Sequence, residues 1–77
     1  MSRMRDLVYA ALPDTKNGAR AAHNIARIIW TDHVPLRQQA GRQAAVTRAL
    51  NTLHRCGKAR YTVNWYGGVP VTEWWRI

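Results

Sequence analysis

The sequence predicts an α+β fold in which three helices are followed by a C-terminal β-hairpin. Apolar residues recur at the helical spacing of about 3.6 as far as Gly57, and at a spacing of about 2 after it. Gly67-Gly68 divides the alternating C-terminal segment and allows a tight reversal between two strands. Seventy-seven residues suffice for one compact core, so we expect a single domain spanning residues 1–77.

The first helix is predicted to end at Pro13, and Ser2 can cap its start. Its apolar positions have the i, i+3, i+4, i+7, i+8 spacing of an amphipathic helix. They are Met4, Leu7, Val8, Ala11 and Leu12. Residues 14–18 are interpreted as a turn in which Asn17-Gly18 supplies a positive φ.

The second helix is predicted from about Ala19 to Trp30. Its apolar side is broad, which indicates the most buried element of the fold. The residues on that side are Ala22, Ile25, Ala26, Ile29 and Trp30. Residues 31–35 should interrupt it, because a residue that precedes a proline is disfavoured in the helical region.

The third helix is predicted to end at Gly57, where glycine can take the left-handed conformation. Its start is open: the helix begins either near Pro35, with a weak point at Gly41, or afresh at Arg42. One apolar stripe along it should face the core. That stripe consists of Ala45, Val46, Ala49, Leu50, Leu53 and Cys56, the last interpreted as a small core residue.

The two arms of the hairpin are predicted from strict alternation along the chain. On the first arm, Ala59, Tyr61, Val63 and Trp65 alternate with Arg60, Thr62, Asn64 and Tyr66, which predicts a strand with one buried face. On the second arm, Trp75 is in phase with Ile77, and Trp75 is predicted to lie in the core, as is Trp30 of the second helix. Trp74 then points outward, where it is a candidate for a dimer contact or a contact with a nucleic-acid backbone.

The charge balance points to a polyanionic partner. Twelve Lys and Arg residues oppose four Asp and Glu residues, which gives a net charge of +8 and a pI near 11.2. No acidic residue occurs between Asp32 and Glu73. Within that span, the polar side of the third helix is studded with arginine, so we interpret it as a candidate recognition helix. That side carries Arg42, Gln43, Thr47, Arg48, Asn51 and Arg55.

The order of three helices followed by a hairpin resembles a winged helix-turn-helix domain. The residues that carry the resemblance are the block AAVTRALNTLHRCGK, which ends at Lys58, and the segment RYTVNWYGGVPVTEWWRI, which follows Ala59. Similar blocks occur in small regulators of phages and mobile elements. The C-terminal Trp-Arg-Ile is also similar to the end of Z-DNA-binding winged-helix domains. Those domains carry asparagine and tyrosine where Thr47 and Asn51 stand here, so that specificity is not carried over.

The resemblance implies a sequence-specific protein that binds double-stranded DNA and regulates transcription. We also expect a homodimer on a two-fold related site, because one such module buries only about 600–1,000 Å² on DNA and two half-sites supply the usual specificity. The third helix would enter the major groove, and the hairpin would lie on the backbone or the minor groove. The implied nucleic-acid-binding residues are Arg37, Gln38, Gln39, Arg42, Gln43, Thr47, Arg48 and Asn51 on the helix side, with Arg60, Asn64 and Tyr66 on the hairpin.

Other functional classes are disfavoured or left as alternatives. Scattered carboxylates and the absence of a phosphate-binding glycine loop argue against an enzyme, and we expect no cofactor. His54 and Cys56 project in different directions on a helix, so we expect no metal site. The chain has no apolar run of membrane-spanning length and no signal peptide, so we expect a cytoplasmic protein. The alternatives are RNA binding and docking on a host protein through Trp65, Tyr66 and Trp74.

Overall fold

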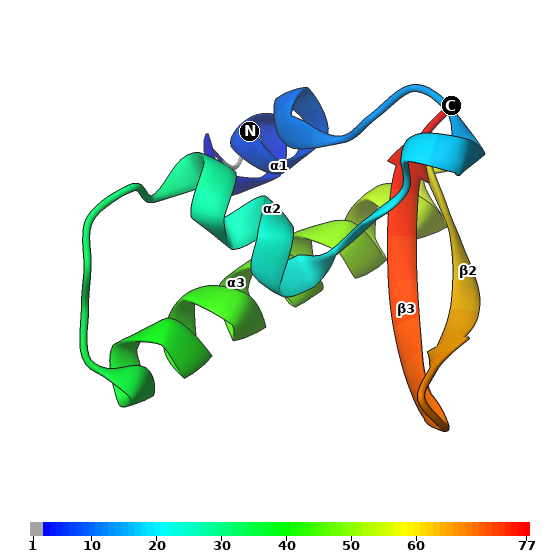
Figure 1. The fold of residues 1–77 in the computed structure, drawn as a ribbon. Coiled ribbons are helices and arrows are strands. Elements are labelled where there is room, and N and C mark those ends of the chain that lie inside the picture. The colour runs from blue at the N-terminus through cyan, green and yellow to red at the C-terminus, as the bar shows by residue number, and fades with distance from the viewer. Residues whose placement is uncertain (1–2) are drawn as a thin grey trace.

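The computed structural model describes residues 3–77, and the proposed cap at Ser2 lies outside that range (Figure 1). Helices occupy the N-terminal two thirds of the chain and the long strands form its C-terminal part, as predicted. The elements in chain order are α1 (Arg3–Ala11), the 3-10 turn η1 (Lys16–Gly18), β1 (Arg20–Ala21), α2 (Ala22–Ile29), α3 (Leu36–Arg55), β2 (Ala59–Tyr66) and β3 (Val69–Arg76).

The sheet has three antiparallel strands in the order β1-β3-β2. The β2–β3 hairpin is confirmed, but β1 was not foreseen. The prediction of helix from Ala19 is wrong for the first residues, because Arg20 pairs with Trp74 and Ala21 with Glu73 across the sheet. Since those residues use their backbone in a strand, α2 starts only at Ala22.

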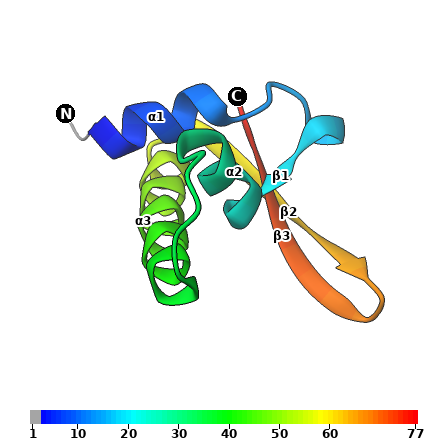
Figure 2. The same ribbon diagram turned by 60° about the vertical axis from the view of Figure 1, so that its left-hand side comes forward.

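The three helices pack around one core that also includes the base of the hairpin. Val8, Ile25, Val46 and Leu50 are fully buried at its centre. Both α1 and α2 lie on the same side of α3 (Figure 1). In the turned view, α3 and the hairpin diverge from a common region, with α2 between them (Figure 2). One face of α3 is therefore left outside the packed helices.

The third helix uses the earlier of its two predicted starts and runs without a break through Gly41. Its predicted stop is confirmed, because Gly57 has a φ of 74° and the chain reverses there. The N–H of Gly57 donates to the backbone carbonyl of His54 at 3.0 Å, and the N–H of Lys58 donates to that of Leu53 at 2.9 Å. Two carbonyl groups of the last helical turn are therefore satisfied beyond the end of α3. By contrast, Asn17-Gly18 does not adopt the predicted positive φ, because this segment is η1.

The predicted orientation of β3 is wrong. Trp74 is 6% exposed and belongs to the core, whereas Ile77 is 62% exposed and Trp75 is only partly buried. The reason is the two-residue loop at Gly67-Gly68, which pairs Tyr66 with Val69 and therefore Tyr61 with Trp74. Directly opposed residues of antiparallel strands share a face, so the odd positions of β2 share theirs with the even positions of β3. Trp74 is thus unavailable as an anchor for a partner.

Cys56 and one face of β2 also depart from the predicted burial. Cys56 is exposed instead of lying in the core, because α3 ends at Arg55 and the chain turns away at that point. On β2, only Ala59 is buried, while Tyr61, Val63 and Trp65 of the same face are exposed. The hairpin extends past the helices, so the core covers only its base (Figure 2).

Candidate nucleic-acid interface

The N-terminal half of α3 stands clear of the core. None of residues 36–45 is buried, and only Arg42 and Ala45 are even partly covered. The buried residues of α3 all lie in its second half, between Val46 and Leu53. The helix also contains no acidic residue. A helix about 30 Å long thus presents its first half to solvent with only positive and neutral side chains.

Three arginines form a line along the outer face of α3. Arg48 follows Arg37 by 11 residues and Arg55 follows it by 18, which correspond to about three and five whole helical turns. They therefore point in nearly the same direction, opposite to the buried Val46 and Leu50. All three are exposed. We call Arg37, Arg48 and Arg55 the arginine stripe.

The other helix residues predicted to bind nucleic acid divide into two groups. Gln38, Gln43, Thr47 and Asn51 are exposed. Thr47 and Asn51 line a groove of about 470 Å³ between α3 and the hairpin. The remaining two predicted residues, Arg42 and Gln39, are engaged within the protein.

Arg42 is held by residues of the α2–α3 connection. Its guanidinium donates to both carboxylate oxygens of Asp32, at 3.2 Å and 3.1 Å, and lies 5.1 Å from the ring centroid of Trp30. This hydrogen bonding lowers the pKa of Asp32 from its usual value of 3.8. Gln39 donates from Nε2 to the carbonyl of Val34 at 2.9 Å. Both side chains fix the connection in place, on the flank of α3 away from the stripe.

The hairpin residues predicted to bind nucleic acid lie on the opposite face of the sheet from the groove. Asn64 and Tyr66 both donate to Oε1 of Glu73, at 2.6 Å and 2.8 Å. The bond to Glu73 raises the pKa of the Tyr66 phenol above 10.0. Arg60 is exposed on that same face of β2. The structure therefore does not bring Arg60, Asn64 and Tyr66 together with the groove residues of α3.

Sequence reasoning missed the residues that complete the groove. The wall opposite α3 includes Tyr61, Thr72 and Trp74 of the hairpin, and His54 closes it at the end of the helix. His54 follows Thr47 by seven residues, close to two helical turns, so its place beside Thr47 could have been deduced from spacing. The hairpin residues could not, because their position depends on the pairing of β2 with β3.

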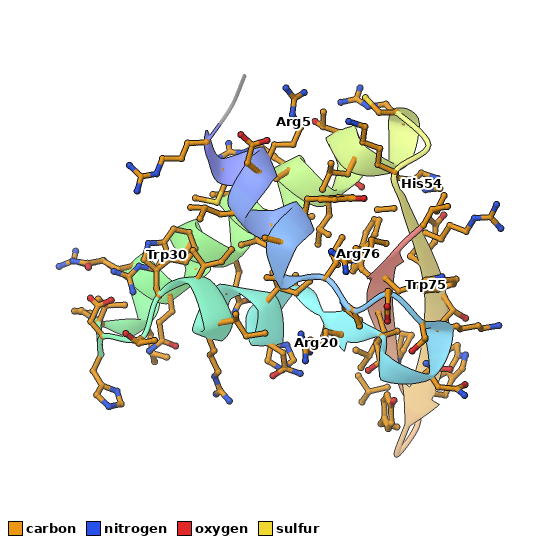
Figure 3. The ribbon with its side chains drawn as sticks, turned by 90° about the horizontal axis from the view of Figure 1, so that it is seen from above. Arg5, Arg20, Trp30, His54, Trp75 and Arg76 are labelled. Carbon is orange, nitrogen blue, oxygen red and sulfur yellow. The ribbon has the colours of Figure 1, made fainter. Side chains whose placement is uncertain are left out.

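The His54 ring is fixed at the base of the hairpin. Its Nδ1 lies 3.1 Å from the carbonyl oxygen of Ala59, and its ring meets Tyr61 edge-on at 5.0 Å between centroids. A carbonyl oxygen can only accept a hydrogen bond, so Nδ1 carries a hydrogen. Seen from above, His54 and Trp30 lie at opposite ends of the molecule, which separates the groove base from the Arg42 contact (Figure 3).

Comparisons with protein-family models, with curated proteins and with solved structures give no match to this chain. Among residues 3–77, no three His, Cys, Asp or Glu side chains come together as ligands for a metal ion. No described helix combines the length and the apolar composition needed to cross a membrane.

Proposed function

We propose that this protein binds double-stranded DNA through the outer face of α3. The observation that carries the proposal is the arginine stripe on a helix without acidic residues, whose first half is open to solvent. Arginine presents a planar fork that matches phosphate oxygens and the acceptor edge of guanine. A helix with this face is suited to a groove lined by phosphates.

The placement of the carboxylates supports the same proposal. Asp32 is paired with Arg42, and Glu73 accepts hydrogen bonds on the hairpin face opposite the groove. Asp6 lies on α1 and Asp14 in the loop after it. The exposed face of α3 is thus free of negative charge from its own helix, and the net charge of +8 attracts a polyanion from all directions.

Duplex DNA is favoured over duplex RNA by the shape of the helix that must be accommodated. The major groove of B-DNA is about 12 Å wide and admits an α-helix, whereas the major groove of A-form RNA is deep and narrow. Three helices with a three-stranded antiparallel sheet are compatible with a winged-helix layout. We therefore propose that the protein acts as a regulator of transcription.

The test replaces two arginines of the stripe and compares this variant with a control variant that has the same change in net charge on another part of the protein. Arg48→Gln/Arg55→Gln lowers the net charge from +8 to +6 (8 − 2), and so does the control Arg3→Gln/Lys16→Gln on α1 and η1. All four side chains are exposed, so both variants should fold. Fluorescence anisotropy with a labelled random-sequence DNA duplex gives the affinity over a range of salt concentrations.

We expect the stripe variant to lose affinity and the control to lose much less. The slope of log affinity against log salt should decrease by about 1.8 for the stripe variant, since each phosphate contact contributes about 0.9. Equal losses in the two variants would mean that only net charge matters and would overturn the assignment to α3. An RNA duplex of equal length that competes as well as DNA would overturn the preference for DNA.

A further inference from the structure

The two outer edges of the hairpin differ in how their backbone groups are satisfied. Along the outer edge of β3, the N–H of Arg76 donates to the carbonyl of Pro13 at 2.8 Å, and Trp74 is paired with Arg20 of β1. Farther out, Pro70 has no N–H to offer. This edge is therefore either paired or blocked over most of its length, which is how proteins avoid unwanted strand pairing.

The outer edge of β2 is open. The N–H of Ile77 donates to the carbonyl of Lys58 at 3.1 Å, which fixes the hydrogen-bonding phase of the ladder. Even-numbered residues of β2 bond to β3, so odd-numbered residues direct their N–H and C=O outward. The outward carbonyl of Ala59 is within bonding distance of the His54 ring. Among residues 3–77, no hydrogen-bond partner is found for the outward groups of Tyr61, Val63 and Trp65.

We infer that this edge pairs with the same edge of a second copy of the chain, antiparallel and about a two-fold axis at Val63. In that register Val63 faces its own counterpart, and Tyr61 and Trp65 face each other across the interface. Every outward N–H and C=O of the three residues then has a partner. The two neighbouring registers are less favourable. A shift toward the base of the hairpin would pair Trp65 with Ala59, whose carbonyl already lies within bonding distance of His54. A shift toward the tip would place Tyr61 opposite the turn residue Gly67.

The exposed side chains of Tyr61, Val63 and Trp65 are suited to pairing with a second copy of the chain. Trp65 is 68% exposed, Tyr61 47% and Val63 45%, and all three lie on one face of β2. The register makes two aromatic pairs flank a β-branched pair, which are the cross-strand pairs that stabilise sheets. It also opposes no like charges, because Arg60, the one charged residue of β2, would face Tyr66 of the second copy.

The position of the hairpin leaves room for such pairing. Its outer half extends away from α2 and α3, and no strand of the described chain pairs with β2 on the side opposite β3 (Figure 2). The outward residues also carry no charge and no proline, the features that usually protect an exposed edge. The inference is independent of nucleic-acid binding, since it concerns only contacts between two protein chains.

The central test exploits the self-contact at Val63. Val63→Lys and Val63→Glu each place like charges opposite one another on the axis, so each variant alone should sediment as a monomer where the unmodified chain sediments as a dimer. An equimolar mixture should restore the dimer, because lysine then opposes glutamate. Thr72→Lys is the matched control, because Thr72 faces Val63 on the neighbouring strand, is exposed and lies away from the free edge. This control should remain dimeric.

A second measurement tests the register by disulfide formation in a Cys56→Ser background, which removes the single native thiol. Val63→Cys should give a covalent dimer on mild oxidation, and Thr72→Cys should give far less. The proposal is overturned if the unmodified chain stays monomeric at every concentration, which would leave the edge to a strand of another protein. It is also overturned if Val63→Lys stays dimeric, or if the Lys and Glu variants fail to associate when mixed.

Discussion

The guanidinium of Arg42 donates two hydrogen bonds to the carboxylate of Asp32, with N···O distances of 3.2 Å and 3.1 Å. Arg42 belongs to α3, and Asp32 to the connection that precedes it. The same guanidinium lies over Trp30 at the end of α2. One side chain therefore links the end of α2 and the α2–α3 connection to the N-terminal half of α3.

Replacing Arg42 should raise the pKa of Asp32. In Arg42→Gln, the carboxylate loses the hydrogen bonds that lower its pKa, so the value should return toward 3.8. In the unmodified protein the folded-state pKa is the lower one. The pair therefore contributes stability above pH 3.8, and this contribution is lost as the pH falls through the folded-state value. NMR titration of the Asp32 carboxyl carbon measures the shift. Arg37→Gln serves as a control and should leave it unchanged.

The pKa of Tyr66 should fall when Glu73 is removed. Glu73 accepts a hydrogen bond from the phenol and raises its pKa above 10.0, so this bond contributes stability below pH 10.0 and is lost as the pH rises through the raised value. In Glu73→Ala, the ring signals of Tyr66 should titrate closer to 10.0 by NMR. If Asn64 and Tyr66 also contact DNA, this variant should bind a duplex more tightly; unchanged affinity would count against those two residues.

Two glycines of the α3 region should respond in opposite ways to alanine. Neither Gly41 nor Gly57 has an atom within 4 Å of an added Cβ, so packing does not distinguish them. Gly41→Ala should stabilise the protein by about 1 kcal/mol, because alanine favours a helix interior. Gly57→Ala should destabilise it by about 1–2 kcal/mol, since the left-handed conformation is unfavourable for a residue with a Cβ. Urea denaturation measures both effects, and changes of the same sign would contradict this explanation.

Truncating tryptophans on one face of the hairpin should separate its buried base from its exposed outer half. Trp74→Ala should destabilise the chain by about 3–5 kcal/mol, as expected for a large buried aromatic side chain. Trp65→Ala should change the stability of the monomer by only about 0.5 kcal/mol, because its side chain is 68% exposed. Thermal denaturation at low protein concentration compares the two. A large effect of Trp65→Ala under these conditions would mean that its side chain packs within the monomer.

The sequence predicts that the polar side of α3 carries the candidate interface, but it does not predict which residues belong to it. The absence of acidic residues from Asp32 to Glu73 is a property of the chain itself. The sequence does not show which cations remain available to a ligand. Arg42 forms an ion pair with Asp32, ten residues earlier, whereas Arg37 and Arg48 are exposed. In the same way, Asn64 and Tyr66 were predicted to bind nucleic acid, but both donate hydrogen bonds to Glu73 on the neighbouring strand.

The sequence by itself determined the three helices, the stop at Gly57 and the hairpin at Gly67-Gly68, because helical period, alternation and glycine conformation are local properties of the chain. Only the tertiary structure decided that Arg20 and Ala21 join the sheet and that Trp74 is buried in place of Trp75. These outcomes depend on which backbone groups pair between segments far apart in the chain. A strand presents two equivalent faces until its neighbour fixes the register, so no pattern within β3 alone could select the buried one.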